Sequence, residues 1–204
     1  MNRTKKEQIL PKIEKLMEEN GGIIKASQLY PLGLTYRGIQ GLVAEGTLDH
    51  VKSGYYSMNY KEKTEEEIIY GLFPDAILTM DTALYYYGYI SQRPFAWSFA
   101  VSKNTSKSRF KIEYPLIHPY YTEPDVLKIG VTEIPFNGEV IHIYEKERLI
   151  CECLKYEERL EHDTMKAALM KYIREPEKDI AKLMMYARER KVVLKVQNRI
   201  GVWL

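Results

Sequence analysis

Residues 1–22 carry apolar side chains at helical spacing and then end in a turn signal. The apolar positions are Ile9, Ile13, Leu16 and Met17. Their spacing predicts one amphipathic helix, and Thr4 can cap its start. Asn20, Gly21 and Gly22 follow directly, and they predict the end of the helix because Gly and Asn readily adopt the left-handed conformation that closes helices.

Short apolar segments and turn residues alternate over the next stretch of the chain. Residues 23–24, both isoleucine, predict a minimal strand. Ser27 can cap a short second helix that contains Leu29. Pro31-Leu32-Gly33 then break this helix, so the segment predicts a turn between two helices.

Thr35 is expected to cap a third helix, residues 36–45, whose apolar side faces inward. The outward side of this helix carries Tyr36, Arg37, Gln40 and Gly41. A hairpin is expected next, with strands at residues 48–51 and 55–58 joined by the turn Lys52-Ser53-Gly54.

This order of elements predicts a winged helix-turn-helix over residues 1–60, a domain that places its last helix in the major groove of DNA. Arg can pair with guanine and Gln with adenine, and hydroxyl groups at a helix start can meet phosphate. The predicted DNA-binding residues are Ser27, Thr35, Tyr36, Arg37, Gln40, Lys52 and Tyr55. The alternative is a protein-docking module in which the same helix face is solvated.

A second domain is predicted over residues 64–204, after a short polar boundary. Thr64 and Glu67 form a capping-box pattern at the start of its first helix, and Asp81 is expected to cap the next one. Residues 95–101 alternate bulky and small side chains, which predicts a strand. Its small side chains leave room for another element of the fold or for a ligand.

Two strands, residues 127–134 and 139–144, are expected to flank the Asn137-Gly138 turn. Helices are then predicted at residues 145–156, at residues 164–174 and from Pro176 to about Arg190. The chain is therefore expected to be an α+β protein, in which a winged helix-turn-helix precedes a mixed α/β domain with antiparallel strands and carboxy-terminal helices.

Charge and composition narrow the functional classes. Of the 204 residues, 45% are apolar, which is ample for a core. The first 60 residues hold eight Lys or Arg against six Asp or Glu, and the remainder is balanced, so DNA binding should be modest and salt-sensitive. Because the sequence has no signal segment and no apolar run of about 20 residues, we expect a cytoplasmic location and no membrane partner.

Basic segments and scattered titratable residues offer further candidates. A basic loop carries Lys103, Lys107, Arg109 and Lys111, and it is either a contact for phosphate or an acidic partner, or a solvated turn. The tail from residue 188 onward is also basic and is a second candidate surface. The histidines lack metal-ligand spacing, Cys151 and Cys153 point apart on one helix, and no catalytic motif is present, so we expect no enzyme activity, metal or cofactor.

Taken together, the sequence resembles the AbiEi-like antitoxins along nearly the whole chain. The matching features are the winged-helix segment Leu34–Tyr56, the pattern Thr82-Ala83-Leu84 up to Gly88, the bulky-small strand, the segment Tyr144–Leu154 after the Asn-Gly hairpin, and the pair Ala168-Leu169. Among these, Leu34–Tyr56 and Tyr144–Leu154 match best.

The resemblance implies a bacterial type IV antitoxin of an abortive-infection, phage-defence system. Such a protein represses its own operon by binding operator DNA and counteracts a nucleotidyltransferase toxin, with no stable complex required and with weak or DNA-induced oligomers. The basic loop around Arg109 is the candidate toxin-counteracting surface. The alternative is a ligand-sensing winged-helix transcription regulator that binds a small molecule between residues 85–89 and the aromatic strand.

Overall fold

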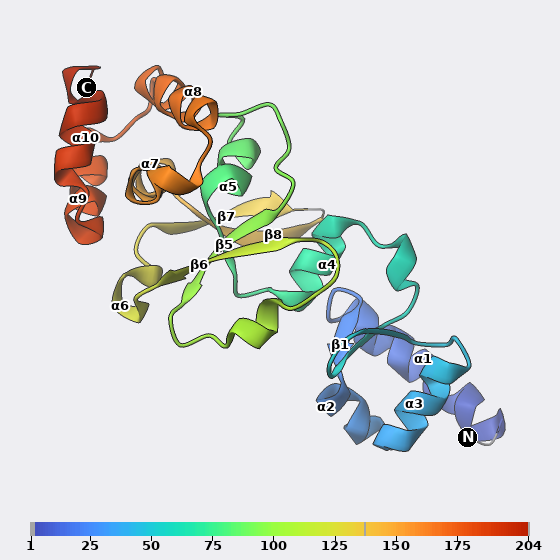
Figure 1. Cartoon of the computed structure of the whole chain (residues 1–204). Coiled ribbons are helices and arrows are strands. Elements are labelled where there is room, and N and C mark those ends of the chain that lie inside the picture. Colours follow the sequence, from blue (N-terminus) through green and yellow to red (C-terminus); the bar gives the residue numbers. More distant parts are fainter. Residues whose placement is uncertain (1–2, 137, 204) are drawn as a thin grey trace. The chain divides into compact units, whose positions relative to one another are not determined.

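The computed structural model describes residues 3–136 and 138–203, except for the side chains of residues 3–5. The chain combines helices with two β-sheets, which confirms the α+β fold class. Its contacts divide it into two compact units, residues 1–74 with 111–115 (unit 1) and residues 75–110 with 116–204 (unit 2). Figure 1 shows the elements of both units along the chain.

Unit 1 joins four helices to a three-stranded antiparallel sheet of order β1-β3-β2. Its elements are α1 (Arg3–Glu18), β1 (Ile23–Lys25), α2 (Ala26–Leu29), the 3-10 turn η1 (Tyr30–Leu32), α3 (Tyr36–Ala44), β2 (Asp49–Lys52), β3 (Tyr55–Ser57), η2 (Tyr60–Glu62) and α4 (Glu65–Leu72). The predicted helices and strands of residues 1–60 are therefore present, within a few residues of their expected ends. The capping role expected of Thr4 lies outside the described side chains.

The core of unit 1 uses the apolar positions that the helical spacing picked out. Ile9, Ile13 and Met17 of α1 are buried with Ile39 and Leu42 of α3. Burial of a side chain of this size is worth about 1.5–3 kcal/mol, so the packing of α1 and α3 against the sheet fixes which face of α3 remains outside.

Helix α4 belongs to unit 1, although the sequence boundary placed it at the start of the second domain. Thr64 and Glu67 form the predicted capping box, with Thr64 Oγ1 accepting from the Glu67 amide at 3.2 Å. At Gly71 an added Cβ would lie 3.0 Å from the Ile23 side chain, so α4 packs closely against β1.

Unit 2 is built on a five-stranded mixed sheet of order β6-β5-β4-β8-β7. The strands are β4 (Ile77–Leu78), β5 (Trp97–Ser102), β6 (Ile117–Thr122), β7 (Val131–Phe136) and β8 (Glu139–Tyr144). The helices are α5 (Met80–Tyr86), α6 (Pro124–Leu127), α7 (Lys146–Lys155), α8 (His162–Ile173), α9 (Ile180–Arg190) and α10 (Val193–Ile200), with 3-10 turns η3 (Lys107–Phe110), η4 (Glu157–Arg159) and η5 (Gly201–Trp203). Helix α5 packs on the sheet, and α8 and α9 pack around α7 (Figure 1).

Several predicted boundaries in unit 2 are wrong. Strand β5 begins at Trp97, and Phe95 lies outside it with 90% of its surface exposed. Both faces of β5 are buried. Helix α5 comes close to this strand at the small residue Ser98, whose amide donates to Thr82 Oγ1 at 2.9 Å. Helix α5 begins at Met80 with Thr79 as its N-cap, so Asp81 lies in the first turn rather than at the cap.

Three further differences concern the second half of the chain. Leu127 ends helix α6 instead of beginning a strand, and β7 starts only at Val131. Helix α9 starts at Ile180 with Asp179 as its N-cap, so Pro176 precedes it. The tail forms a helix, α10, that the sequence did not signal. Gly138 has φ 83° in the two-residue β7–β8 turn, whereas Asn137 lies outside the described residues.

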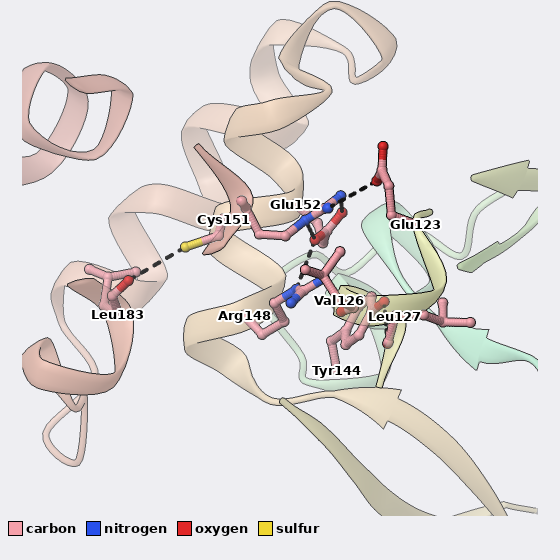
Figure 2. A network of polar contacts seen from close by, with 9 residues as sticks. Glu123, Val126, Leu127, Tyr144, Arg148, Cys151, Glu152 and Leu183 are labelled. Atoms are coloured by element: carbon pink, nitrogen blue, oxygen red, sulfur yellow. Dashed lines mark hydrogen bonds and ion pairs between the residues drawn. The ribbon is translucent and has the colours of Figure 1, made fainter. Parts of the chain in front are cut away.

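A buried ion network joins α7 to α9 (Figure 2). Glu152 accepts from Arg148 Nε at 2.8 Å and from Arg190 Nη2 at 2.9 Å, and Arg190 Nε makes a further short contact with it. All three side chains are at least 98% buried. Arg148 also donates to the Val126 carbonyl at 3.1 Å, so one carboxylate holds two helices together and Arg148 ties them to α6.

Candidate nucleic-acid interface

The outward face of α3 carries the predicted recognition residues. Tyr36 is 64% exposed, and Arg37 is also exposed. Thr35 is the N-cap, as predicted, and its Oγ1 accepts from the Gly38 amide at 3.2 Å. Because the first amide groups of a helix are open to an anion, the start of α3 presents an aromatic ring, a guanidinium and free N–H donors together.

Gln40 is less free than the sequence suggested. Its Nε2 donates to the Tyr56 hydroxyl at 3.1 Å. Tyr56 is a buried residue of β3, and burial raises the pKa of its hydroxyl. The contact holds the Gln40 amide in one orientation and leaves its carbonyl oxygen and second N–H for another partner.

The hairpin after α3 gathers two lysines around one tyrosine. Lys52 Nζ lies 4.5 Å from the Tyr55 ring centroid and 5.0 Å from that of Phe73. Lys25 Nζ lies 5.8 Å from the same Tyr55 ring. Such distances allow a cation–π interaction between each ammonium group and the ring.

Sequence reasoning missed Lys25, because no local pattern places it beside the hairpin. The register of the sheet does so: Lys25 of β1 and Lys52 of β2 both pair with Tyr55 of β3. Only the strand order β1-β3-β2 brings the two lysines to opposite sides of that residue.

Acidic side chains near α3 and the hairpin are already engaged. Glu45, which follows α3, is bound by Lys6, and this contact lowers the pKa of the Glu45 carboxyl. Asp49 Oδ2 accepts from the Tyr60 amide at 2.8 Å. The two acids nearest Arg37 in the sequence therefore oppose its positive charge less than their number suggests.

Ser27 does not have the predicted capping role. Helix α2 begins at Ala26 with Lys25 as its N-cap, and the Lys25 amide donates to Gln28 Oε1 at 2.8 Å. This bond satisfies the amide of the N-cap residue itself, and Ser27 is an exposed residue within the helix.

The predicted basic loop is partly neutralised. Lys103 forms an ion pair with Glu123 at 2.6 Å, which lowers the pKa of that carboxyl to about 2. Arg109 Nη1 donates to Asp75 at 2.8 Å. Lys107 is exposed in unit 2, whereas Lys111 is exposed in unit 1, so the structure assigns the four cations to two separate units.

The basic tail is also largely engaged inside unit 2. Arg190 is buried against Glu152, and Lys195 and Arg199 both bind Glu157, at 3.1 and 3.2 Å. Arg188 and Lys191 remain exposed. The tail therefore presents a much smaller positive surface than its composition implies.

The ligand site expected beside residues 85–89 is not large enough for a small molecule. The void lined by Tyr85, Tyr86 and Trp97 measures only about 10 Å³, roughly the space of one water. Tyr86 and Trp97 pack with Phe136 at ring-centroid distances of 5.5 and 5.8 Å, so these aromatic residues form core rather than a pocket.

Within residues 3–136 and 138–203, no cluster of His, Cys, Asp or Glu is placed to hold a metal ion. Cys151 and Cys153 are both buried and unpaired with each other, and burial raises the pKa of the Cys151 thiol to about 12. No helix of the described part of the chain is long and apolar enough to cross a membrane.

Comparison with known proteins adds no relative. No protein-family model matches the chain, and no curated protein matches its sequence significantly.

Proposed function

We propose that this chain is an antitoxin of a bacterial type IV toxin–antitoxin system that also represses its own operon. In this proposal unit 1 is a winged helix-turn-helix that binds operator DNA. Unit 2 counteracts a nucleotidyltransferase toxin. The observation that carries the DNA-binding half is the exposed face of α3, with Tyr36 and Arg37 at its start, next in the chain to a lysine-flanked hairpin.

The topology of unit 1 supports the winged-helix interpretation. A helix, a short strand, two helices separated by a turn at Gly33, and a two-stranded hairpin follow one another, and β1 pairs with the returning strand of the hairpin. This is the order expected of such a domain. Helix α3 would enter the major groove while Lys25 and Lys52 contact phosphate.

The antitoxin half rests on the resemblance to AbiEi-like proteins in Leu34–Tyr56 and Tyr144–Leu154. The second of these segments covers β8 residue Tyr144 and most of α7, which carries Arg148 and Glu152 of the buried network. It is therefore structural in this chain, and we propose that exposed side chains of unit 2, with Lys107 first among them, supply the toxin-counteracting surface.

Binding to the DNA upstream of the gene tests the repressor role. Arg37→Ala should weaken operator binding by about 1–3 kcal/mol and have less effect on random DNA, because a guanidinium that pairs with a base reads sequence. Lys52→Ala should weaken both alike, because phosphate contacts carry no sequence information. Lys61→Ala, an exposed lysine on η2, is the matched control and should change neither. Equal losses on both DNAs for Arg37→Ala would contradict the assignment.

Salt dependence tests how many cations take part. With Lys25 and Lys52 engaged on phosphate, log K should fall with log salt at a slope of about −2 for one copy and about −4 for two copies on an inverted repeat. A slope near zero would exclude a phosphate-binding interface on this face.

Co-expression with a nucleotidyltransferase toxin, which the proposal expects to be encoded beside this chain, tests the antitoxin role. The chain should restore growth, and Arg37→Ala should restore it equally, because the proposal assigns rescue to unit 2. Lys107→Glu should weaken rescue, whereas Lys128→Glu, another exposed lysine of unit 2, is the control. No rescue by the unaltered chain would refute the antitoxin role and leave the repressor role standing.

A further inference from the structure

A cleft of about 320 Å³ lies in unit 2 beside β6, the edge strand of the sheet. Its walls come from four places in the chain: Asp81 of α5, Phe95 before β5, Tyr120 of β6, and Arg159 of η4. The volume is at the lower end of the range of small-molecule sites, about 300–1,000 Å³. It is separate from the aromatic cluster in which sequence reasoning placed a ligand.

The acid in this cleft is held in place and carries no cation. Asp81 Oδ1 accepts from the Thr82 amide at 2.9 Å and from Ser98 Oγ at 2.6 Å. Over the described ranges, no Lys, Arg or His nitrogen comes within ion-pairing distance of its carboxylate. Two fixed donors thus orient the group and leave its second oxygen without an ionic partner.

The cation in the cleft is likewise positioned without an acid. The Arg159 guanidinium lies 5.3 Å from the Tyr120 ring centroid and 5.6 Å from that of Tyr156. It forms no ion pair with any carboxylate of the described residues. Tyr120 is buried, and burial raises the pKa of its hydroxyl to about 12.

Asp81 differs from the other half-exposed acids in the described part of unit 2, which form ion pairs. Glu145 is paired with Lys182, Glu157 with Lys195, and Glu175 with Lys146. A charge partly removed from water is costly unless it is paired. Asp81 is such a charge, and the exposed Arg159 is held beside two aromatic rings in the same cleft, so the two side chains resemble the two ends of a binding site.

We propose that this cleft binds a free α-amino acid, with the ligand ammonium on Asp81 and its carboxylate on Arg159. The cleft contains two acids, Asp81 and Glu161, and two arginines, Arg93 and Arg159, so it is neutral overall and suits a ligand with one charge of each sign. A phosphate-bearing ligand would add net negative charge that this balanced set does not offset. Apolar residues of the lining, with Phe95 at 90% exposure, are available for the ligand side chain.

The site has a counterpart in the sequence pattern of β5. Small residues in this strand were expected to leave room for another element or for a ligand. Ser98 lies against α5, and its hydroxyl donates to Asp81, the acid of the proposed ligand site. The proposal goes beyond the antitoxin and repressor roles and makes unit 2 an effector-binding unit whichever of those roles holds.

Titration calorimetry of the full chain with each of the twenty amino acids tests the proposal. At least one should bind with a Kd below roughly 10 mM. Its N-acetyl derivative, which lacks the ammonium, and its amide, which lacks the carboxylate, should each bind at least about tenfold more weakly, because each loses one charge-assisted contact. These capped ligands test both contacts on the unaltered protein, so the result does not depend on any variant folding.

Two substitutions and two matched controls locate the site. Asp81→Asn keeps the Oδ1 acceptor and Arg159→Gln keeps a polar side chain, and each should weaken binding at least about tenfold. Asp163→Asn and Arg174→Gln, exposed and outside the cleft, should leave it unchanged. Three results would each overturn the proposal. The first is that no amino acid binds. The second is that binding is unchanged by the N-acetyl group, by the amide or by both cleft substitutions. The third is that AMP binds and amino acids do not.

Discussion

Replacing Glu152 with glutamine should destabilise unit 2 strongly, although the side chain barely changes size. Glu152 is 1% exposed and is the shared acceptor of Arg148 and Arg190. Glutamine preserves volume, so no cavity forms and the loss comes from charge and hydrogen bonding alone. The variant leaves the buried Arg148 guanidinium without its counter-ion and leaves Arg190 only the Glu123 carboxylate, whose Oε2 lies 3.8 Å from Arg190 Nη1.

The size of the loss follows from this geometry. Glu152 accepts three hydrogen bonds, one from Arg148 and two from Arg190. Bonds to charged groups contribute about 1.5–3 kcal/mol each, and removing one partner of a buried pair costs about 3–5 kcal/mol in all, because such terms are not additive. A domain has only about 5–15 kcal/mol of unfolding free energy, so the variant should be close to unfolding.

Urea denaturation followed by tryptophan fluorescence measures the loss. Trp97 and Trp203 both lie in unit 2, so the signal reports that unit. Glu158→Gln, an exposed acid on η4, is the control and should change the unfolding free energy by less than about 0.5 kcal/mol.

A triple variant, Arg148→Met with Glu152→Leu and Arg190→Met, separates charge from packing. Because it removes the whole network, no charge remains buried alone, and it should be more stable than Glu152→Gln. The reasoning fails if Glu152→Gln lies within about 1 kcal/mol of the parent, or if the triple variant is the less stable of the two.

Three smaller predictions follow from other contacts. Cys151 and Cys153 should react with a thiol reagent at pH 8 only after denaturation, because burial raises both thiol pKa values; rapid labelling of the native chain would show that α7 opens. Thr35→Ala should lower the unfolding free energy of unit 1 by about 1 kcal/mol through loss of the α3 cap, as read from a urea midpoint, and an unchanged midpoint would mean that the cap is dispensable. The pKa of Glu123 is held at about 2 by Lys103, so the stabilisation from this pair is present above the ordinary carboxyl pKa and is lost as pH falls toward 2; Lys103→Gln should raise that pKa in an NMR titration, and no change would contradict the pairing.

Local sequence signals predicted unit 1 well because they act over one turn of chain. The Thr35 and Thr64 caps each bind an amide three residues ahead, and the apolar spacing of α1 identifies its buried side without reference to any other element. Such features can be read from a single sequence because both partners lie within four residues of each other.

Two of the errors arose where a distant partner sets the outcome. Phe95 continues the bulky-small alternation, yet the register of β5 with β6 begins at Trp97, so the pattern outruns the strand. Helix α10 starts just after Lys191, which has φ 58°, and has no side-chain cap. Its buried Val196 and Ile200 show that packing stabilises this helix. Packing between segments that are distant in the sequence cannot be read from local spacing.

Net charge alone is a poor guide to the candidate sites for the same reason. Over residues 1–74 and 111–115 the sequence has eleven basic and eleven acidic residues, which would argue against binding to DNA. Four of those acids lie at residues 62–67, where Glu67 caps α4, while Glu45 and Asp49 near α3 have partners of their own. Because screened charges act over about 8–10 Å, a phosphate at the start of α3 would respond to Arg37 and its immediate surroundings and little to the sum over the unit.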